Sequence, residues 1–196
     1  MKKVFLTLAV ILGVKAYSQQ SILILNNYSA YDFHGPLFAN PLNSCIPSVG
    51  ITYPANPDQV IVPADSHQGN GLALIYKSYA DAGTNPLYPV ASYQVQTAST
   101  SPAQIRIPTH PILNPTGPVS MNTDWRHTKF QMYFKGTNVK VSSGGVNIPE
   151  NYFNGNLGDG LNTCFSGQSY ISTTYGDAEW FTITGSSVKY SYIQIY

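Results

Sequence analysis

Two carboxylates near the end of the chain are spaced as an acid and base pair could be. Asp177 and Glu179 are the only closely spaced acidic residues in the sequence. On a strand, side chains two positions apart point to the same face about 7 Å from each other, which overlaps the separation of glycosidase carboxyl pairs. The competing interpretation is a turn aspartate and a solvent-facing glutamate, with Trp180 in the core. We favour this second interpretation, because catalytic carboxylates usually come from separate strands and one of them needs an apolar setting.

Aromatic residues with a polar edge are the second candidate group, here for binding. The chain has fifteen tyrosines and two tryptophans, Trp125 and Trp180. Such rings are favoured on surfaces that stack against sugars or dock another protein, because they offer a large contact area at low entropic cost. Trp125 lies in the polar stretch 122–127, whose side chains could hydrogen-bond what the ring stacks on. We expect Trp125 first, and Trp180 after it, to bind a ligand; the alternative is that the aromatic residues only fill strands and rims.

The other residue types that could carry chemistry lack a recognisable spacing. The loop 154–162 is rich in oxygen ligands and glycine, as calcium loops are, but it has one carboxylate and no closing glutamate. The four histidines are at least seventeen positions apart, without the short spacings of a zinc site. The sequence also lacks serine-hydrolase and phosphate-binding glycine motifs. We therefore predict no metal site and no cofactor.

The two cysteines, Cys45 and Cys164, predict a disulfide. An exported chain with an even number of cysteines most simply pairs them in an oxidising compartment. The bridge would close a loop of about 120 residues and add roughly 3 to 5 kcal/mol to stability. A nucleophilic thiol at Cys164 is the alternative, which we disfavour because a free reactive thiol would be oxidised outside the cytosol.

The first eighteen residues have the features of an export signal. Lys2 and Lys3 give a positive start, 4–14 is an apolar run, and Ala16 and Ser18 are small residues before a cut. An uncleaved anchor is the alternative, but a spanning helix needs roughly 20 apolar residues. We predict a signal peptide over 1–18 and a periplasmic or extracellular protein. The short dilysine signal resembles those of exported proteins of Gram-negative bacteria.

The chain without its signal is slightly acidic. Removing residues 1–18, which hold three of the ten basic residues, leaves 178 residues with seven basic and nine acidic ones. This balance argues against nucleic acid or an anionic membrane as a partner, because both require clustered lysine and arginine. No later apolar run is long enough to span a membrane, so no stable membrane insertion is expected after cleavage. The length predicts one domain, residues 19–196.

The composition predicts an all-β fold. Charged residues are 10% of the chain, whereas β-branched and aromatic residues are plentiful. Thirteen of the fourteen prolines lie between Pro36 and Pro118, which predicts short strands separated by ordered loops. We expect an antiparallel β-sandwich, Ig-like or jelly-roll-like. Its strands are predicted at 21–26, 31–38, 59–63, 72–79, 90–97, 104–107, 129–134, 139–142, 169–174, 178–184 and 188–196.

The first and last predicted strands have distinctive patterns. The segment 21–26 is apolar on both faces and is therefore expected inside a sheet. The segment 188–196 ends on an aromatic residue, as strands of membrane barrels do, but neither of its faces is apolar to the end. A membrane barrel also needs eight or more strands of roughly 9 to 11 residues, which the proline-rich half cannot supply. We therefore expect the closing strand of a water-soluble sandwich.

These features favour a secreted, non-catalytic binding or adhesion-type protein that recognises an extracellular carbohydrate or a surface protein through exposed aromatic residues. One alternative is a secreted hydrolase that uses Asp177 and Glu179. A second alternative is a structural subunit of a surface assembly joined by strand addition. In a eukaryotic source, Asn27-Tyr28-Ser29 would also be a glycosylation sequon.

Overall fold

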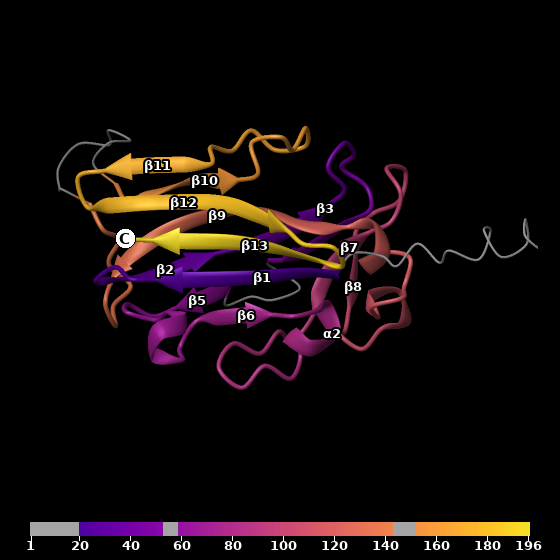
Figure 1. Ribbon diagram of the computed structural model, residues 1–196, viewed down its shortest axis with the longest axis horizontal. Coiled ribbons are helices and arrows are strands. Elements are labelled where there is room, and N and C mark those ends of the chain that lie inside the picture. Colours follow the sequence, from indigo (N-terminus) through magenta and orange to yellow (C-terminus); the bar gives the residue numbers. More distant parts are fainter. Residues whose placement is uncertain (1–19, 53–58, 143–151) are drawn as a thin grey trace, which may run out of the picture.

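Two β-sheets packed face to face make up the described part of the chain (Figure 1). The computed structural model describes residues 20–52, 59–142 and 152–196, so the predicted signal peptide lies outside the described residues. The prediction of an all-β sandwich is confirmed. No helix in these three ranges is long and apolar enough to cross a membrane.

The first sheet has five strands in the order β11-β12-β13-β1-β6. Their bounds are β1 (Gln20–Asn27), β6 (Leu74–Tyr76), β11 (Tyr170–Thr173), β12 (Gly176–Thr184) and β13 (Val188–Ile195). β1 is hydrogen-bonded on both sides, which confirms its predicted interior position. β1 and β13 run side by side in the same direction (Figure 1). The named strands of this sheet are therefore antiparallel except at one parallel pair.

The second sheet has eight strands, seven in the order β5-β2-β9-β3-β4-β7-β8 and an eighth, β10, paired with β9. Their bounds are β2 (Tyr31–Gly35), β3 (Leu37–Asn40), β4 (Ser48–Ile51), β5 (Val60–Val62), β7 (Tyr93–Gln96), β8 (Gln104–Arg106), β9 (Asp124–Phe134) and β10 (Asn154–Gly158). Four short helices lie in the connections: η1 (Gln68–Asn70), α2 (Tyr79–Ala82), η2 (Pro111–Leu113) and η3 (Ser120–Asn122).

A proline divides what the sequence predicts as one strand, 31–38. β2 ends before Pro36 and β3 begins after it. Proline has no N–H for the ladder, and the Pro36 carbonyl instead accepts a hydrogen bond from the Thr128 hydroxyl at 2.7 Å. β2 and β3 still pair with the same long strand, β9, one after the other along its length.

A β-bulge in β9 changes which of its side chains face the core. Phe38 lies opposite His127 and Ala39 lies opposite Trp125, so Arg126 is the extra residue of the ladder. A bulge of this kind re-aims the side chains around it. The core-facing residues of β9 are therefore Trp125 before the bulge and Thr128, Phe130 and Met132 after it.

The hydrophobic core lies between the inner faces of both sheets. Leu23 and Leu25 of β1 and Ile193 and Ile195 of β13 are fully buried there. Complete burial of such a side chain contributes about 1.5 to 3 kcal/mol. The opposite sheet completes the core with fully buried Phe33, Leu37, Ala39, Val49, Ile51, Val62, Tyr93 and Met132.

Candidate functional site: the outer face of the five-stranded sheet

The outer face of the five-stranded sheet carries apolar side chains in cross-strand register. A sheet face that meets water usually carries polar residues in alternation with the core face. Here two adjacent cross-strand rows are aromatic and aliphatic instead: Phe181–Tyr192–Ile24–Ile75 and Ile183–Tyr190–Ile22. Ile183 is 52% exposed and the other members of the two rows are partly exposed, except Ile24, which is 4% exposed beneath its neighbours.

A polar row continues this face toward the ends of β1 and β13. Tyr170, Glu179, Gln194 and Asn26 lie opposite one another in successive strands. Tyr196 follows β13 and is 48% exposed, and its hydroxyl donates to the Glu179 carboxylate at 2.7 Å. We call the whole set the outer tyrosine face: Ile22, Ile24, Asn26, Ile75, Tyr170, Glu179, Phe181, Ile183, Tyr190, Tyr192, Gln194 and Tyr196.

Two rings of the outer tyrosine face, Phe181 and Tyr192, are stacked on each other. Phe181 and Tyr192 are cross-strand neighbours whose ring centroids are 4.8 Å apart with planes 10° from parallel. Because this distance equals the spacing of neighbouring strands, about 4.8 Å, the two ring faces are turned to each other. The edges and hydroxyl groups of such rings therefore point away from the sheet.

A second stack of rings lies at the end of the outer tyrosine face. Tyr28 stacks on Tyr196 with centroids 5.7 Å apart and on His67 with centroids 4.6 Å apart. Tyr28 is 43% exposed. The stack extends the aromatic surface beyond β13 to the turn after β1 and to the start of η1.

The two predicted catalytic carboxylates lie on this same face. Ala178 and Trp180 are buried, so the alternating Asp177 and Glu179 point outward from β12 and are partly exposed. Glu179 is hydrogen-bonded to Tyr196, and the Asp177 backbone pairs with that of Tyr196. The structure thus brings the two carboxylates to one face but places neither of them in an apolar enclosure.

Trp125, the first predicted ligand-binding residue, lies in the core. Its side chain is 1% exposed, and its ring contacts Tyr76 and Tyr79 with centroid distances of 6.2 and 5.3 Å. A ring in this position has no free face for a ligand, so a stacking role for Trp125 finds no support. The physical reason is the bulge at Arg126, which turns Trp125 inward although its sequence neighbours are polar.

Trp180, the second predicted ligand-binding residue, is also buried, at 4% exposure. It projects inward from β12, where the indole Nε1 has no hydrogen-bond partner in the described chain. A surface-stacking role is excluded by this placement for Trp180 as well. The sequence analysis predicted exposed aromatic residues, and in the structure these are tyrosines of the outer face.

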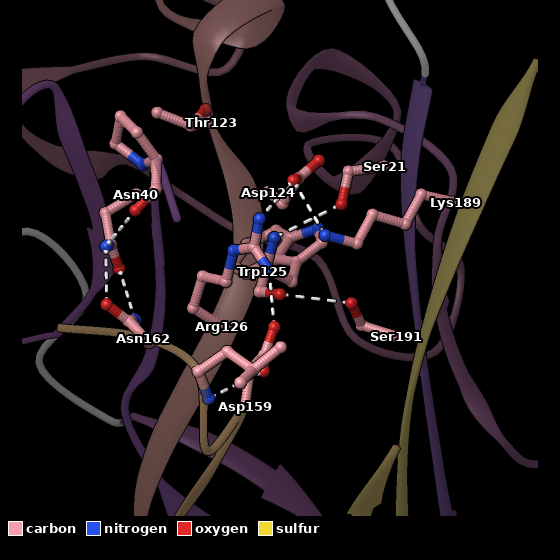
Figure 2. A network of polar contacts seen from close by, with 12 residues as sticks. Ser21, Asn40, Thr123, Asp124, Trp125, Arg126, Asp159, Asn162, Lys189 and Ser191 are labelled. Atoms are coloured by element: carbon pink, nitrogen blue, oxygen red, sulfur yellow. Dashed lines mark hydrogen bonds and ion pairs between the residues drawn. The ribbon is translucent and has the colours of Figure 1, made fainter. Parts of the chain in front are cut away.

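A network of charged side chains lies where the two sheets meet (Figure 2). Arg126, 4% exposed, forms ion pairs with Asp159 and, at 2.6 Å, with Asp124. Lys189 of β13 reaches Asp124 at 2.9 Å and so connects the five-stranded sheet to the network. The Trp125 carbonyl accepts a hydrogen bond from Ser191 of β13 at 3.0 Å. These contacts hold the bulged part of β9 against the five-stranded sheet.

The predicted disulfide between Cys45 and Cys164 is present, with the two Cα atoms 5.2 Å apart. It ties the connection after β3 to the connection after β10. Beside it, the amides of Asn40 and Asn162 donate to each other's oxygens at 3.1 Å in both directions (Figure 2). The disulfide, these side-chain hydrogen bonds and a backbone hydrogen bond from Thr163 to Leu42 at 3.5 Å hold the two segments together.

The predicted loop 154–162 forms a strand and a turn. β10 takes its first five residues, and Gly158 allows close pairing because a Cβ there would lie 2.6 Å from the Arg126 carbonyl oxygen. Asp159, the only carboxylate of the loop, is engaged by Arg126. Within the described ranges, no three histidine, cysteine, aspartate or glutamate side chains gather as they would around a metal ion.

The histidines occupy separate places in the fold. His34 packs against Tyr133, and burial lowers its pKa although Asp32 opposes the shift. His127 is stacked between Phe38 and Phe165, and burial lowers its pKa to about 4. His127 is therefore a neutral aromatic ring near neutral pH.

The asparagine of the possible glycosylation sequon is unsuited to modification in the folded protein. Asn27 is fully buried. Its side-chain amide nitrogen donates to the carbonyl oxygens of Tyr31, Val62 and Pro63 at 2.7, 3.2 and 3.0 Å. The residue stabilises the turn after β1.

The fold and this surface define an all-β sandwich with an aromatic outer face. The chain matches no protein-family model, no curated protein and no solved structure. The argument about function therefore depends on the geometry of the described residues.

Proposed function

We propose that the protein is exported and acts as a non-catalytic binding protein that docks an extracellular protein partner through the outer tyrosine face. One observation carries this proposal: outward-facing residues of four neighbouring strands form apolar cross-strand rows. Contiguous exposed apolar surface is a feature of interaction sites, and tyrosine is enriched where proteins dock. The leader-like residues 1–18 and the disulfide support an extracytoplasmic location.

A protein partner fits this face better than a carbohydrate does. A sugar ring stacks on the free face of an aromatic ring, but Phe181 and Tyr192 turn their faces to each other. The row beside them contains Ile183 and Ile22, which offer no ring to a sugar. Upright ring edges, hydroxyl groups and aliphatic side chains on a sheet are the components of a protein interface.

The two other functions considered gain less from the structure. Catalysis by Asp177 and Glu179 would need an enclosure for one carboxylate, and both lie on the open face. Strand addition would need an accessible edge, and the outermost strands are short: β5, β6 and β8 have three residues each, β11 has four, and β10, which lies beside β9, has five. Very short edge strands are a common protection against edge pairing.

Photo-crosslinking at single positions tests the docking face. A photoreactive phenylalanine analogue is placed at Tyr192 of the mature protein, and in a matched variant at Tyr133 on the outer side of the opposite sheet. Both variants are incubated with the surface proteins of the producing cells and irradiated. We expect a discrete crosslinked protein from position 192 that position 133 does not give, and that excess unlabelled protein displaces.

Two further variants determine the nature of the partner. Phe181→Ser and Tyr192→Ser should abolish the crosslink to a probe at position 190 while leaving the fold intact. Binding of the same proteins to a glycan array tests whether the face recognises a carbohydrate instead. Array binding that these substitutions remove, without any protein crosslink, would replace the protein partner by a carbohydrate; equal crosslinking from positions 192 and 133 would disprove the docking face.

A further inference from the structure

A hollow of about 380 Å³ opens beside the charged network where the sheets meet. Arg126 of β9, Trp180 and Thr182 of β12, and Lys189 of β13 line it. The two disulfide-linked connections complete its wall with Leu42, Asp159, Gly160, Leu161 and Ser169. Thr184 and Phe181 also line it, and because Phe181 belongs to the outer tyrosine face, the hollow adjoins that face.

Unpartnered polar atoms gather at this hollow. In the described chain, four buried side-chain nitrogen or oxygen atoms have no hydrogen-bond partner, and three of them belong to residues that line it: Arg126 Nε, Trp180 Nε1 and Thr182 Oγ1. Buried polar groups are nearly always hydrogen-bonded. Three such atoms in residues around one hollow are the observation from which we argue a binding site.

The charges around the hollow favour an uncharged occupant. Arg126 and Lys189 are balanced by Asp124 and Asp159, with which they form ion pairs. An anion would therefore add an uncompensated charge to a partly buried site, which is costly. The open positions are two N–H donors and one hydroxyl, so the occupant needs oxygen acceptors and at least one hydroxyl of its own.

We propose that this hollow binds a small neutral carbohydrate, a mono- or disaccharide, in a second site that adjoins the docking face at Phe181. Ring and hydroxyl oxygens of the sugar accept from Arg126 Nε and Trp180 Nε1, and a sugar hydroxyl pairs with Thr182. The Asp159 carboxylate has lone pairs left for a further sugar hydroxyl. Ligand sites commonly have volumes of about 300 to 1,000 Å³, and this hollow is at the small end of that range.

Binding requires a small movement of the wall. The three unpartnered atoms are shielded from solvent, beneath the lining of the hollow. The connection 159–169 is the part that can give way, because Leu161 at its tip is 74% exposed and contributes little to the core. The disulfide limits the movement, since it fixes Cys164 to the opposite connection.

The two indole N–H groups of the chain provide a direct test by NMR. The mature, disulfide-linked protein is labelled with ¹⁵N, and the two indole signals are assigned with Trp180→Phe. The protein is then titrated with glucose, galactose, mannose, N-acetylglucosamine and their common disaccharides, and separately with acetate and galacturonate. We expect at least one neutral sugar to shift the Trp180 signal saturably while the Trp125 signal stays in place.

Matched threonine variants make the test specific. Thr182→Val keeps the shape of the side chain and removes the hydroxyl, so the sugar should bind about five- to tenfold more weakly. Thr174→Val, in the exposed turn before β12, should bind as the wild type does. The proposal is overturned if no neutral sugar shifts the Trp180 signal, if only the carboxylates do, if only bound water is detected at the indole, or if both variants respond alike.

Discussion

The outer tyrosine face and the network around Arg126 place their polar groups in opposite surroundings. On the outer face, the hydroxyl of Tyr196 meets both solvent and the Glu179 carboxylate. Around Arg126, charged groups are withdrawn from solvent and neutralise one another between two sheets. Side chains of the outer tyrosine face can be removed without exposing the core to solvent, whereas those of the network around Arg126 cannot. Exposed aromatic residues that contribute little to folding are thus the better indication of a binding role.

Among changes in and around the Arg126 network, removal of the disulfide should cause the largest loss in the free energy of unfolding. Cys45 and Cys164 are 119 positions apart, and a bridge across a loop of that size contributes about 4 to 5 kcal/mol in the chain-entropy description. We expect Cys45→Ala with Cys164→Ala to lose this amount in urea unfolding of the mature protein. The reduced wild type should lose a similar amount. A loss below about 1 kcal/mol in both would contradict the prediction.

Arg126→Met should have the next largest effect. It leaves two carboxylates, Asp124 and Asp159, without their shared partner in a partly buried place, and breaking such a pair costs about 3 to 5 kcal/mol. Arg106→Met is the matched control, since Arg106 lies on the edge strand β8 and contacts the Gln104 side chain. Surface changes of that kind stay within about 0.5 kcal/mol. Equal losses of stability in both variants would contradict the prediction that the ion pairs of Arg126 stabilise the fold more than a surface arginine does.

Acidification should weaken the same region through His127. Burial lowers the pKa of His127 from 6.5 to about 4, so the folded state binds a proton less readily than the unfolded state. The stability that depends on the neutral ring is complete above pH 6.5 and is lost as the pH falls toward 4, by an amount on the order of 2 to 3 kcal/mol.

His127→Phe isolates this contribution. Phenylalanine retains the stack between Phe38 and Phe165 but cannot titrate. Unfolding measured at several values between pH 6.5 and pH 4 should show a flatter pH dependence for the variant than for the wild type. Parallel curves would show that other groups cause the acid sensitivity.

Substitution on the outer tyrosine face should have the smallest effect on stability. Tyr192→Ser removes one stacked pair, worth about 0.5 to 1.5 kcal/mol, because Phe181 is its ring partner there. Thermal unfolding should therefore change little, while partner crosslinking is lost. A loss as large as that of Arg126→Met would mean that the face serves folding rather than docking.

Local patterns were sufficient to predict several parts of the fold. The alternation in 21–26 predicted a strand that is apolar on both faces, and β1 is an interior strand. The pairing of Cys45 with Cys164 followed from their number alone. The alternation in β12 placed Asp177 and Glu179 outward and Trp180 in the core, and this interpretation, rather than a ligand-binding role for Trp180, agrees with its burial.

Other features depend on contacts that no local pattern records. The bulge at Arg126 reverses the alternation in β9, so the polar neighbours of Trp125 suggested an exposed ring that is in fact buried. The segment 154–158, part of the predicted loop 154–162, is a strand paired with β9, and the missing Cβ of Gly158 permits the close approach to Arg126 and His127. The predicted strand 139–142 forms only isolated bridges.

The parallel pairing of β1 with β13 determines when the molecule can complete its fold. β1 lies between β13 and β6, so the first strand of the sandwich is held on one side by β13, which is separated from it by about 160 residues and is the last strand of the described chain. Pairings between segments so distant in sequence form slowly. Until residues 188–195 have left the ribosome, the apolar residues of β1 lack their main partner, and the five-stranded sheet cannot be completed.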